Sequence, residues 1–284
     1  MGKIKYLSNL VIDQIAAGEI IERPASVIKE LLENSIDSGA NTISLFINQG
    51  GMESIEVCDN GEGIKYEDLP LCVARHATSK IKNISDLNKC DTHGFRGEAL
   101  AAISSVSSLK IITRINKDDK GHTLEKIDEN WKCTPSPAKK GTTVIVEELF
   151  HRIPVRKKFL KSIATELTYS KNSFLKTSMI HNEINWHFFS NGKESIKMPA
   201  QKISERFANF CDVSVDKINY IKKIIGPILI EICFPFSDNE KRKTNNQFIY
   251  VNNRTVNNRT IFHAIRSTFE EVIHGNKNLS IFLS

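Results

Sequence analysis

The side chains of Glu30, Asn34 and Asp37 are spaced so that a helix would carry all three on one face. At about 100° per residue they fall in a narrow sector, opposite the apolar residues of the stretch VIKELLENSIDSGA. Such a sector can be an ordinary solvated face. Asparagine, however, is a poor residue for a helix interior unless its amide has something to bind. The pattern therefore leaves two interpretations open, a solvated face and a binding site.

Glycine is concentrated at two places where the backbone would need to come close to a ligand. In DNGEG, Asp59 ends an expected strand and precedes Gly61 and Gly63. A carboxylate there could accept a hydrogen bond from an exocyclic amine, while backbone without side chains leaves room for a flat ring. In GFRGEAL, Gly94 and Gly97 frame a loop that enters a helix, whose first amides could face phosphate oxygens. Each stretch is also typical of a plain turn.

Several common catalytic and nucleotide-binding motifs are absent from the sequence. It has no G-x-x-x-x-G-K-[ST], no G-x-G-x-x-G after a strand, no G-x-S-x-G and no H-E-x-x-H. A nucleotide would therefore have to bind without a P-loop. The six cysteines are scattered without a C-x-x-C pair, which indicates neither a disulfide framework nor a four-thiolate zinc site and is typical of a reducing compartment.

Hydrophobic periodicity predicts the elements that would position these residues. Helices are expected around residues 8–17 and 24–38, followed by two antiparallel strands joined at the Gly50-Gly51 turn. A helix should follow GFRGEAL, and residues 116–140 have the composition of a long exposed hairpin or loop between two further strands.

The second part of the chain has its own expected order. A helix over residues 163–179 and a strand at INWHFFS lead into NGKESIKMPAQK, which has the composition of a junction. A short helix, two strands, an amphipathic helix and a final strand are expected beyond it. We therefore place a domain boundary near residue 200, giving domains over residues 1–200 and 201–284.

Composition favours a soluble protein with some affinity for polyanions. The net charge is +6, and basic residues cluster in RKK at residues 156–158 and in KRK at residues 241–243. The N-terminal stretch lacks the apolar run of a signal peptide, and the most apolar later run is interrupted by prolines and a glutamate. The expected location is cytoplasmic, associated with the nucleoid if the source is bacterial, with no membrane partner.

Four features in chain order resemble the nucleotide-binding set of the gyrase, histidine-kinase, heat-shock-chaperone and MutL ATPase superfamily. They are a helix with E-x-x-x-N, a strand ending in D-x-G-x-G, a glycine loop opening a helix, and GTT leading a strand. Within that superfamily, QIAAGEIIERPASVIKELLENSIDSGA, RHATSKI, GFRGEALAAISSV and PVRKKFL look like the MutL family of DNA mismatch repair proteins. The resemblance covers nearly the whole chain and is strongest over residues 14–106.

The resemblance implies a fold. The first domain would be a Bergerat-type ATPase domain, an α/β (α+β) sandwich whose mixed, mainly antiparallel sheet is backed by helices. The second would be a smaller α/β domain resembling the transducer domain. We expect it to lack its carboxy-terminal end, since the chain stops at Ser284, before the segment that would complete that domain.

The resemblance also implies roles for individual residues, with ATP and Mg²⁺ as cofactors. Glu30 matches the general base that activates water for attack on the terminal phosphate, and Asn34 matches the residue that holds Mg²⁺. Helix geometry alone does not choose Glu30 over Glu33. Asp59 matches the adenine-reading carboxylate, and Thr143 matches a hydroxyl that supports it. The other matched nucleotide-site positions are Gly61, Gly63 and, in the lid over the phosphates, Thr78, Ser79, Lys80, Gly94, Phe95, Arg96 and Gly97.

Partners and function follow from the same resemblance. The implied partners are the mismatch-recognition protein MutS, a downstream nuclease or helicase, and a second copy of the chain, with which it would form a homodimer on ATP binding. The implied function is an ATP-binding, slowly hydrolysing switch that couples mismatch recognition to downstream repair, without nuclease activity in this chain. The alternative is a nucleotide-gated DNA-binding scaffold with little turnover, because the expected missing segment would supply a lysine to the phosphates.

DNA binding is expected to be weak and largely independent of sequence. Arg266 lies on the expected amphipathic helix where the family presents basic side chains to DNA, although a solvated arginine is an equal alternative. The residues expected to contact DNA are Arg266, Arg156, Lys157 and Lys158.

Overall fold

The computed structural model describes residues 17–18, 20–78, 97–118, 120–128, 130–235, 247–270 and 280–284. The chain divides into two compact units. The first consists of Met1–Phe174 and Ile184–Lys197, and the second of Leu175–Glu183 and Met198–Ser284. The helix predicted around residues 8–17 lies almost entirely outside the described residues.

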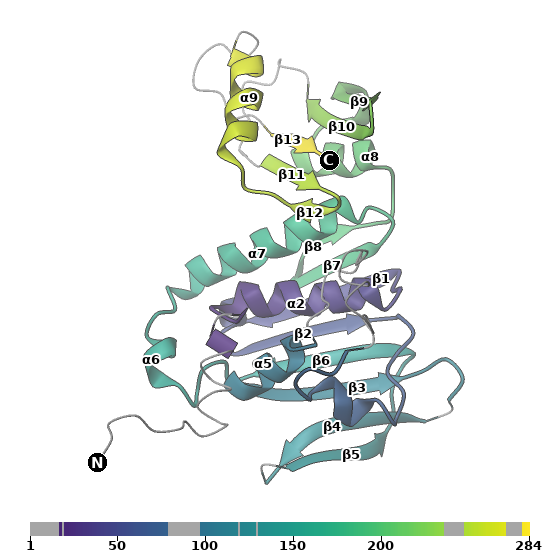
Figure 1. Ribbon diagram of the computed structural model, residues 1–284, viewed down its shortest axis with the longest axis vertical. Helices are drawn as coiled ribbons and strands as arrows, with labels where there is room; N and C mark the ends of the chain where they lie inside the picture. The colour runs from purple at the N-terminus through teal and green to yellow at the C-terminus, as the bar shows by residue number, and fades with distance from the viewer. Residues whose placement is uncertain are drawn as a thin grey trace. The chain divides into compact units, whose positions relative to one another are not determined.

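The first unit is built on an eight-stranded mixed sheet (Figure 1). Its strand order is β5-β4-β3-β6-β2-β1-β7-β8, in which β1 and β7 run parallel and every pairing from β5 across to β1 is antiparallel. The predicted mixed, mainly antiparallel sheet is confirmed. The strands are β1 (Thr42–Asn48), β2 (Ser54–Asp59), β3 (Ser108–Arg114), β4 (Gly121–Ile127), β5 (Asn130–Ser136), β6 (Gly141–Glu147), β7 (Asn185–Ser190) and β8 (Lys193–Met198).

Helices cover one face of this sheet, so the first unit is a two-layer sandwich, as predicted (Figure 1). Alternate residues of β1 are buried, which is the pattern of a strand with one face against a core. The apolar side of α2 packs there, and Phe174 of α7 meets Trp186 and Phe188 of β7 edge-on. The helices are α2 (Pro24–Asp37), α3 (Leu69–Cys72), α5 (Ala99–Val106), α6 (Pro154–Lys157) and α7 (Ile163–Ile180), with a short η1 (Gln49–Gly51).

Two details of the predicted element order change in the structure. The stretch NGKESIKMPAQK contains β8 (Lys193–Met198), which extends the sheet beside β7, so it is not only a junction. Residues 116–140, expected as a long exposed hairpin or loop, contain the β4–β5 hairpin, and β4 pairs with β3 and buries Leu124. The second unit has a sheet of five strands where three strands were expected. The β9–β10 hairpin is largely exposed and has little of the alternation that marks a half-buried strand, so periodicity is a poor guide to its strands.

The second unit has a five-stranded sheet in the order β12-β11-β13-β10-β9. Ile249, Ile265 and Ile281 form a buried cluster that joins β11, α9 and β13. No helix among the described residues is long and apolar enough to cross a membrane. The elements are α8 (Ile203–Cys211), η2 (Val215–Lys217), β9 (Ile218–Ile225), β10 (Ile228–Pro235), β11 (Gln247–Val251), β12 (Arg254–Thr255), α9 (Arg259–Glu270) and β13 (Ile281–Leu283).

A buried arginine joins the two chain segments of the second unit. Arg206 is 1% exposed and donates hydrogen bonds to the carbonyl oxygens of Ser178, His181 (2.8 Å) and Pro199 (2.7 Å). Loss of hydration on burial lowers the pKa of Arg206 to about 10, so it stays charged at neutral pH. Three carbonyl acceptors offset part of the cost of burying this cation.

Candidate functional site

Helix α2 carries the two residues assigned to hydrolysis and metal binding. Pro24 stands at its first turn and Gly39 lies just past its end with φ +71°, the expected start and stop signals. Glu30 and Asn34 are partly buried and one turn apart on its polar face. Glu33 instead pairs with Lys29, with 3.6 Å between Nζ and Oε1. The structure thus gives Glu33 a local ion pair, and the choice of Glu30 as the general base stays a prediction.

The carboxylate of Asp59 is held at the end of β2 by three donors. The Ser35 hydroxyl donates to Oδ2 at 3.0 Å, and the backbone N–H groups of Gly61 and Thr142 donate to Oδ1 at 2.9 and 3.2 Å. Two of these donors come from other elements, α2 and β6. Asp59 is therefore fixed relative to the helix that carries Glu30.

The electrostatics of Asp59 suit a hydrogen-bond acceptor for a neutral donor. Burial raises the pKa of its carboxyl above the ordinary value of 3.8, and the donors at Gly61, Ser35 and Thr142 partly oppose the shift. No positive side chain is among the causes of the shift. A desolvated carboxylate of this kind gains from an amine that hydrogen-bonds to its remaining lone pairs.

The residue that joins α2 to Asp59 is Ser35, which the sequence pattern did not predict. Ser35 is 4% exposed and follows Asn34 directly, inside a stretch whose polar residues were assigned to one outward face. Its helical position lies on the buried side, and a buried serine with no apolar role is a signal for a hydrogen-bonding partner. The partner itself, 24 residues away, carries no local signal.

The structure gives the Thr143 hydroxyl a partner other than Asp59. Thr143 lies opposite Cys58 in the β2–β6 register, and its hydroxyl donates to Cys58 Sγ at 3.4 Å. Side chains alternate between sheet faces, so Thr143 points away from the face that Asp59 shares with Val57. Support from β6 comes from the backbone of Thr142. A role of Thr143 in nucleotide binding stays a prediction.

The glycines of DNGEG lie where backbone segments approach closely. Gly63 has φ +78°, and a Cβ there would come within 2.5 Å of the carbonyl oxygen of Arg114. Gly61 packs against Ser38, whose Oγ would lie 1.9 Å from such a Cβ. The Gly61 N–H bond to Asp59 also closes a turn, so the turn and the site occupy the same residues.

We predict that Gly141→Ala destabilises the protein and disturbs the Asp59 carboxylate. Gly141 has φ +107°, and a Cβ there would lie 2.1 Å from the backbone oxygen of Asp59. The expected loss in unfolding free energy is roughly 2–4 kcal/mol, from backbone strain and a rigid clash. Urea denaturation measures it. Gly192→Ala is the control, since Gly192 has φ +76° with nothing within 4 Å, and an equal loss in both variants would contradict the clash.

Two residues assigned to the lid, Thr78 and Gly97, lie close together in the structure. A Cβ on Gly97, which has φ +61°, would lie 2.4 Å from the Ala77 oxygen and 3.1 Å from Thr78 Cβ. His76 Nδ1 and Glu98 Oε1 are 3.2 Å apart and add a second contact. The structure therefore brings Thr78 and Gly97 together. The remaining lid assignments lie outside the described residues, namely Ser79, Lys80, Gly94, Phe95 and Arg96.

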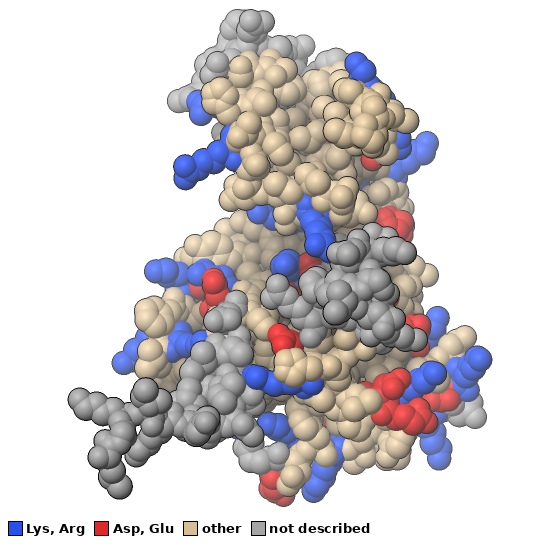
Figure 2. Space-filling view, in the orientation of Figure 1, with Lys and Arg blue, Asp and Glu red and all other residues tan. Residues whose placement is uncertain are grey.

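The residues assigned to DNA differ in their surroundings. Lys157 is the last residue of α6 and Lys158 follows it; both are exposed, in a region where Lys and Arg side chains gather in Figure 2. Arg156 is partly buried, and its guanidinium fills the space next to Gly18, where a Cβ would clash with it. Arg266 is exposed on α9, in the second unit. The described residues thus assign Arg156 a packing role, whereas DNA contact stays a prediction for all four.

The fold and the position of this site define a class of protein. Residues 21–145 match the family model described as histidine kinase-, DNA gyrase B- and HSP90-like ATPase, and residues 211–284 match the model described as DNA mismatch repair protein, C-terminal domain. The first unit is therefore an ATPase domain of the gyrase, histidine-kinase and heat-shock-chaperone type.

Individual relatives narrow the class. The chain is 38% identical to the DNA mismatch repair protein MutL of Herminiimonas arsenicoxydans over 99% of this chain and 47% of that protein. It is 37% identical to MutL of a Neisseria meningitidis serogroup C strain over 96% of this chain and 42% of that protein. The chain belongs to the MutL family of DNA mismatch repair proteins. It spans about half the length of these relatives.

Solved structures agree with this assignment. The ATPase domain of Aquifex aeolicus MutL, determined with ADP, superposes with a TM-score of 0.71 at 26% identity, over 93% of this chain and 91% of that one. The N-terminal domain of a DNA repair protein superposes with a TM-score of 0.73 at 25% identity, over 96% of this chain and 86% of that one. The structural match extends across both units.

Proposed function

We propose that this chain binds ATP with Mg²⁺, hydrolyses it slowly, and acts as a conformational switch in mismatch repair. The observation that carries the proposal is the Asp59 carboxylate, buried and held by Ser35, Gly61 and Thr142. Such an acceptor suits the exocyclic amine of adenine. It is fixed to α2, the helix that carries Glu30 and Asn34, so recognition and chemistry share one rigid element.

In the proposed reaction Glu30 orients and deprotonates the attacking water. A carboxylate near the reacting atoms can serve as a general base, and Glu30 stands one turn before Asn34. Asn34 offers an amide oxygen to the metal. Bound Mg²⁺ would neutralise charge on the phosphates. The chain's own contribution is thus to hold the adenine at Asp59 and the water at Glu30.

The donor set fits a magnesium ion better than a metal held by protein alone. Among the described residues, no group of three or more His, Cys, Asp or Glu side chains could hold a metal ion. Mg²⁺ typically keeps several waters and binds through one or two protein oxygens and the substrate phosphates. An oxygen from Asn34 is consistent with that arrangement.

Single-turnover hydrolysis of labelled ATP, with and without Mg²⁺, tests the proposal directly. Conversion to ADP that requires Mg²⁺ would support an ATPase. Binding without conversion would favour the alternative, a nucleotide-gated scaffold. Absence of binding would contradict both. Coupling to MutS, to a downstream nuclease or helicase, and to homodimer formation on ATP binding belong to the same proposal and can be measured by sedimentation with and without nucleotide.

We predict weak DNA binding that falls steeply with salt. Each phosphate neutralised by Lys or Arg releases condensed counterions, so the logarithm of affinity should fall linearly with the logarithm of salt concentration. Replacing Lys157 and Lys158 together by Gln should lower the salt slope by roughly two units, and Arg266→Glu should weaken binding further. Fluorescence anisotropy with an unrelated duplex measures both effects. Affinity that does not change with salt would contradict the prediction.

A further inference from the structure

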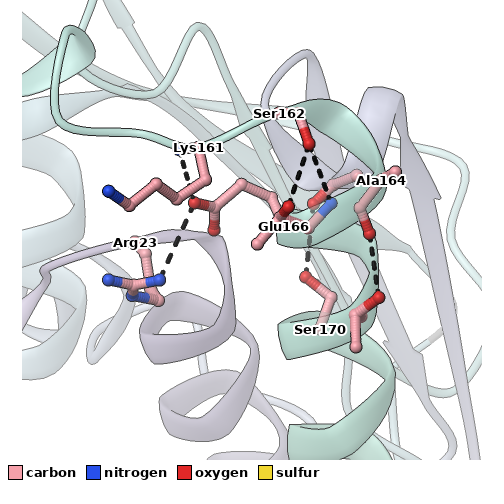
Figure 3. A network of polar contacts seen from close by, with 9 residues as sticks. Arg23, Lys161, Ser162, Ala164, Glu166 and Ser170 are labelled. Carbon is pink, nitrogen blue, oxygen red and sulfur yellow. Dashed lines mark hydrogen bonds and ion pairs between the residues drawn. The ribbon is translucent and has the colours of Figure 1, made fainter.

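Glu166 is a fully buried carboxylate that the proposed reaction does not use. Its side chain is 0% exposed, near the start of α7. Oε1 accepts the Lys161 backbone N–H at 2.9 Å and lies 3.7 Å from Nη1 of Arg23 (Figure 3). Oε2 accepts no hydrogen bond from any residue that the structure describes. A buried carboxylate with an unsatisfied oxygen is costly even beside a partly exposed arginine, so stability alone is a weak reason for Glu166.

Arg23 connects this carboxylate to the catalytic helix. It precedes Pro24, in extended conformation with φ −161°, and α2 has neither a side-chain cap nor an acidic residue in its first turn. The Arg23 guanidinium also lies over the Tyr169 ring, 4.5 Å from its centroid. Two α7 side chains, Glu166 and Tyr169, thus hold the residue at which α2 begins.

Further contacts from the same face of α7 hold the start of α2 and the neighbouring turn. The Ser170 hydroxyl donates to the Gly50 oxygen at 3.2 Å, and the Ser173 hydroxyl donates to the Ala25 oxygen at 3.2 Å. Glu166, Ser170 and Ser173 stand at helical spacing on one side of α7. A Cβ on Gly50 would lie 2.7 Å from the Ile163 oxygen, so the helix backbone packs directly on the turn.

The geometry points to Glu166 as a positioning residue for hydrolysis, acting through Arg23 on the placement of α2. Glu30 follows Arg23 by seven residues, which is close to two helical turns and the same side of the helix. A rotation or slide of α2 at Arg23 therefore moves Glu30 relative to Asp59 and the nucleotide. This inference rests on the proposed ATPase function and extends it to α7.

The most selective variant is Glu166→Gln. Glutamine keeps an oxygen that can accept the Lys161 N–H, so the start of α7 is preserved while the charge facing Arg23 is lost. Arg23 is 31% exposed and can be solvated. Arg23→Gln should destabilise the protein more than Glu166→Gln does, because it leaves the Glu166 charge buried and unpaired. Arg23→Lys keeps a positive charge and is the rescue variant, whereas Lys29→Gln breaks an ion pair on the same helix and is the control.

The test measures single-turnover rate, ADP affinity and hydrogen exchange of residues 24–37 at a temperature where every variant is folded. For Glu166→Gln we expect a rate about tenfold lower, since small misplacements of a catalytic group are costly. ADP affinity should stay within about threefold, because Ser35, Gly61 and Thr142 still hold Asp59. Hydrogen exchange of α2 should be faster in Glu166→Gln than in the wild type. The double variant Glu166→Gln, Arg23→Gln should hydrolyse ATP no more slowly than Arg23→Gln alone, because both changes break the same contact.

Other results would overturn the inference. The inference fails if Glu166→Gln has the same hydrolysis rate and the same hydrogen exchange of α2 as the wild type and Lys29→Gln. A lower melting temperature of Glu166→Gln with an unchanged hydrolysis rate would show that Glu166 is only structural. If Arg23→Lys hydrolysed ATP no faster than Arg23→Gln, the positive charge at residue 23 would not be what positions α2. If the wild type hydrolyses no ATP, the proposed function fails, and the exchange of α2 in Glu166→Gln still decides whether Glu166 positions the helix.

Discussion

Replacing Glu30 by alanine is expected to slow ATP hydrolysis by roughly 10² to 10⁴, the usual effect of losing a positioned general base. Nucleotide affinity should change little, because the proposed acceptor for adenine is Asp59 at the end of β2 and its donors are untouched. The measurement is single-turnover hydrolysis, with affinity for ADP determined separately by fluorescence titration. A loss in rate without a loss in affinity is the signature of an interaction made in the transition state.

Glu33→Ala is the matched control for this prediction. Glu33 is on the same helix, but its carboxylate pairs with Lys29. Ion pairs of this i,i+4 spacing contribute about 0.3–0.5 kcal/mol on a helix surface, and the Lys29 side chain is exposed, so the variant should fold and hydrolyse nearly as the wild type does. A wild-type rate in Glu30→Ala would mean that Glu30 is not the base. An equal loss in Glu33→Ala would mean that the charge of the helix matters more than either position.

Asp59→Asn is expected to abolish detectable nucleotide binding while leaving the fold intact. The asparagine Oδ1 can accept the N–H groups of Gly61 and Thr142, and its amide can donate to the Ser35 hydroxyl. The amide then presents a donor where the carboxylate presented an acceptor, so an exocyclic amine meets a donor. A loss in affinity of roughly 10³-fold or more is typical when a buried polar site is mismatched in this way. Titration with fluorescent ADP measures it.

The fold of Asp59→Asn should be at least as stable as that of the wild type at neutral pH. The raised pKa of Asp59 means that the folded state binds its proton more tightly than the unfolded chain does. The stability contributed by this group is therefore fully present below pH 3.8 and is lost as pH rises through the folded pKa. Asparagine does not titrate, so Asp59→Asn does not lose this stability as pH rises. The melting temperature of Asp59→Asn should therefore exceed that of the wild type at neutral pH, and the difference should shrink as pH falls towards 3.8.

Two observations would contradict this account of Asp59. Binding that survives in Asp59→Asn would show that the carboxylate does not read the nucleotide. A large fall in melting temperature at neutral pH would show that its charge stabilises the fold. Ser35→Ala separates the two roles, because it removes one donor but keeps the acceptor, and it should retain binding with an affinity lowered by about tenfold at most.

Wild-type binding should also depend on pH. The acceptor role of Asp59 requires the ionised form, and burial moves its protonation above the ordinary value of 3.8. Affinity for ADP should therefore weaken at a higher pH than it would for a solvent-exposed aspartate.

Local patterns in the sequence determined much of this site. The 3.6-residue period of residues 24–38 predicted α2 and put Glu30 and Asn34 on one face, and the turn at Gly50-Gly51 predicted the β1–β2 hairpin that ends at Asp59. These features depend on neighbours a few residues apart, so helix and strand geometry are sufficient to derive them. The order of the motifs then supplied the resemblance to the MutL family, which the comparisons confirmed.

The tertiary structure alone decided which groups meet. The backbone N–H of Thr142 donates to Asp59, whereas the Thr143 side chain lies opposite Cys58, because the β2–β6 register sets which residues meet across the two strands. Arg23 meets Glu166 because α7 packs against the start of α2. Such contacts join segments far apart in the chain, where no local period relates one residue to the other. They are fixed by strand register and helix packing, which is why the sequence predicted the helix that carries Glu30 and Asn34 but only the fold showed what holds that helix.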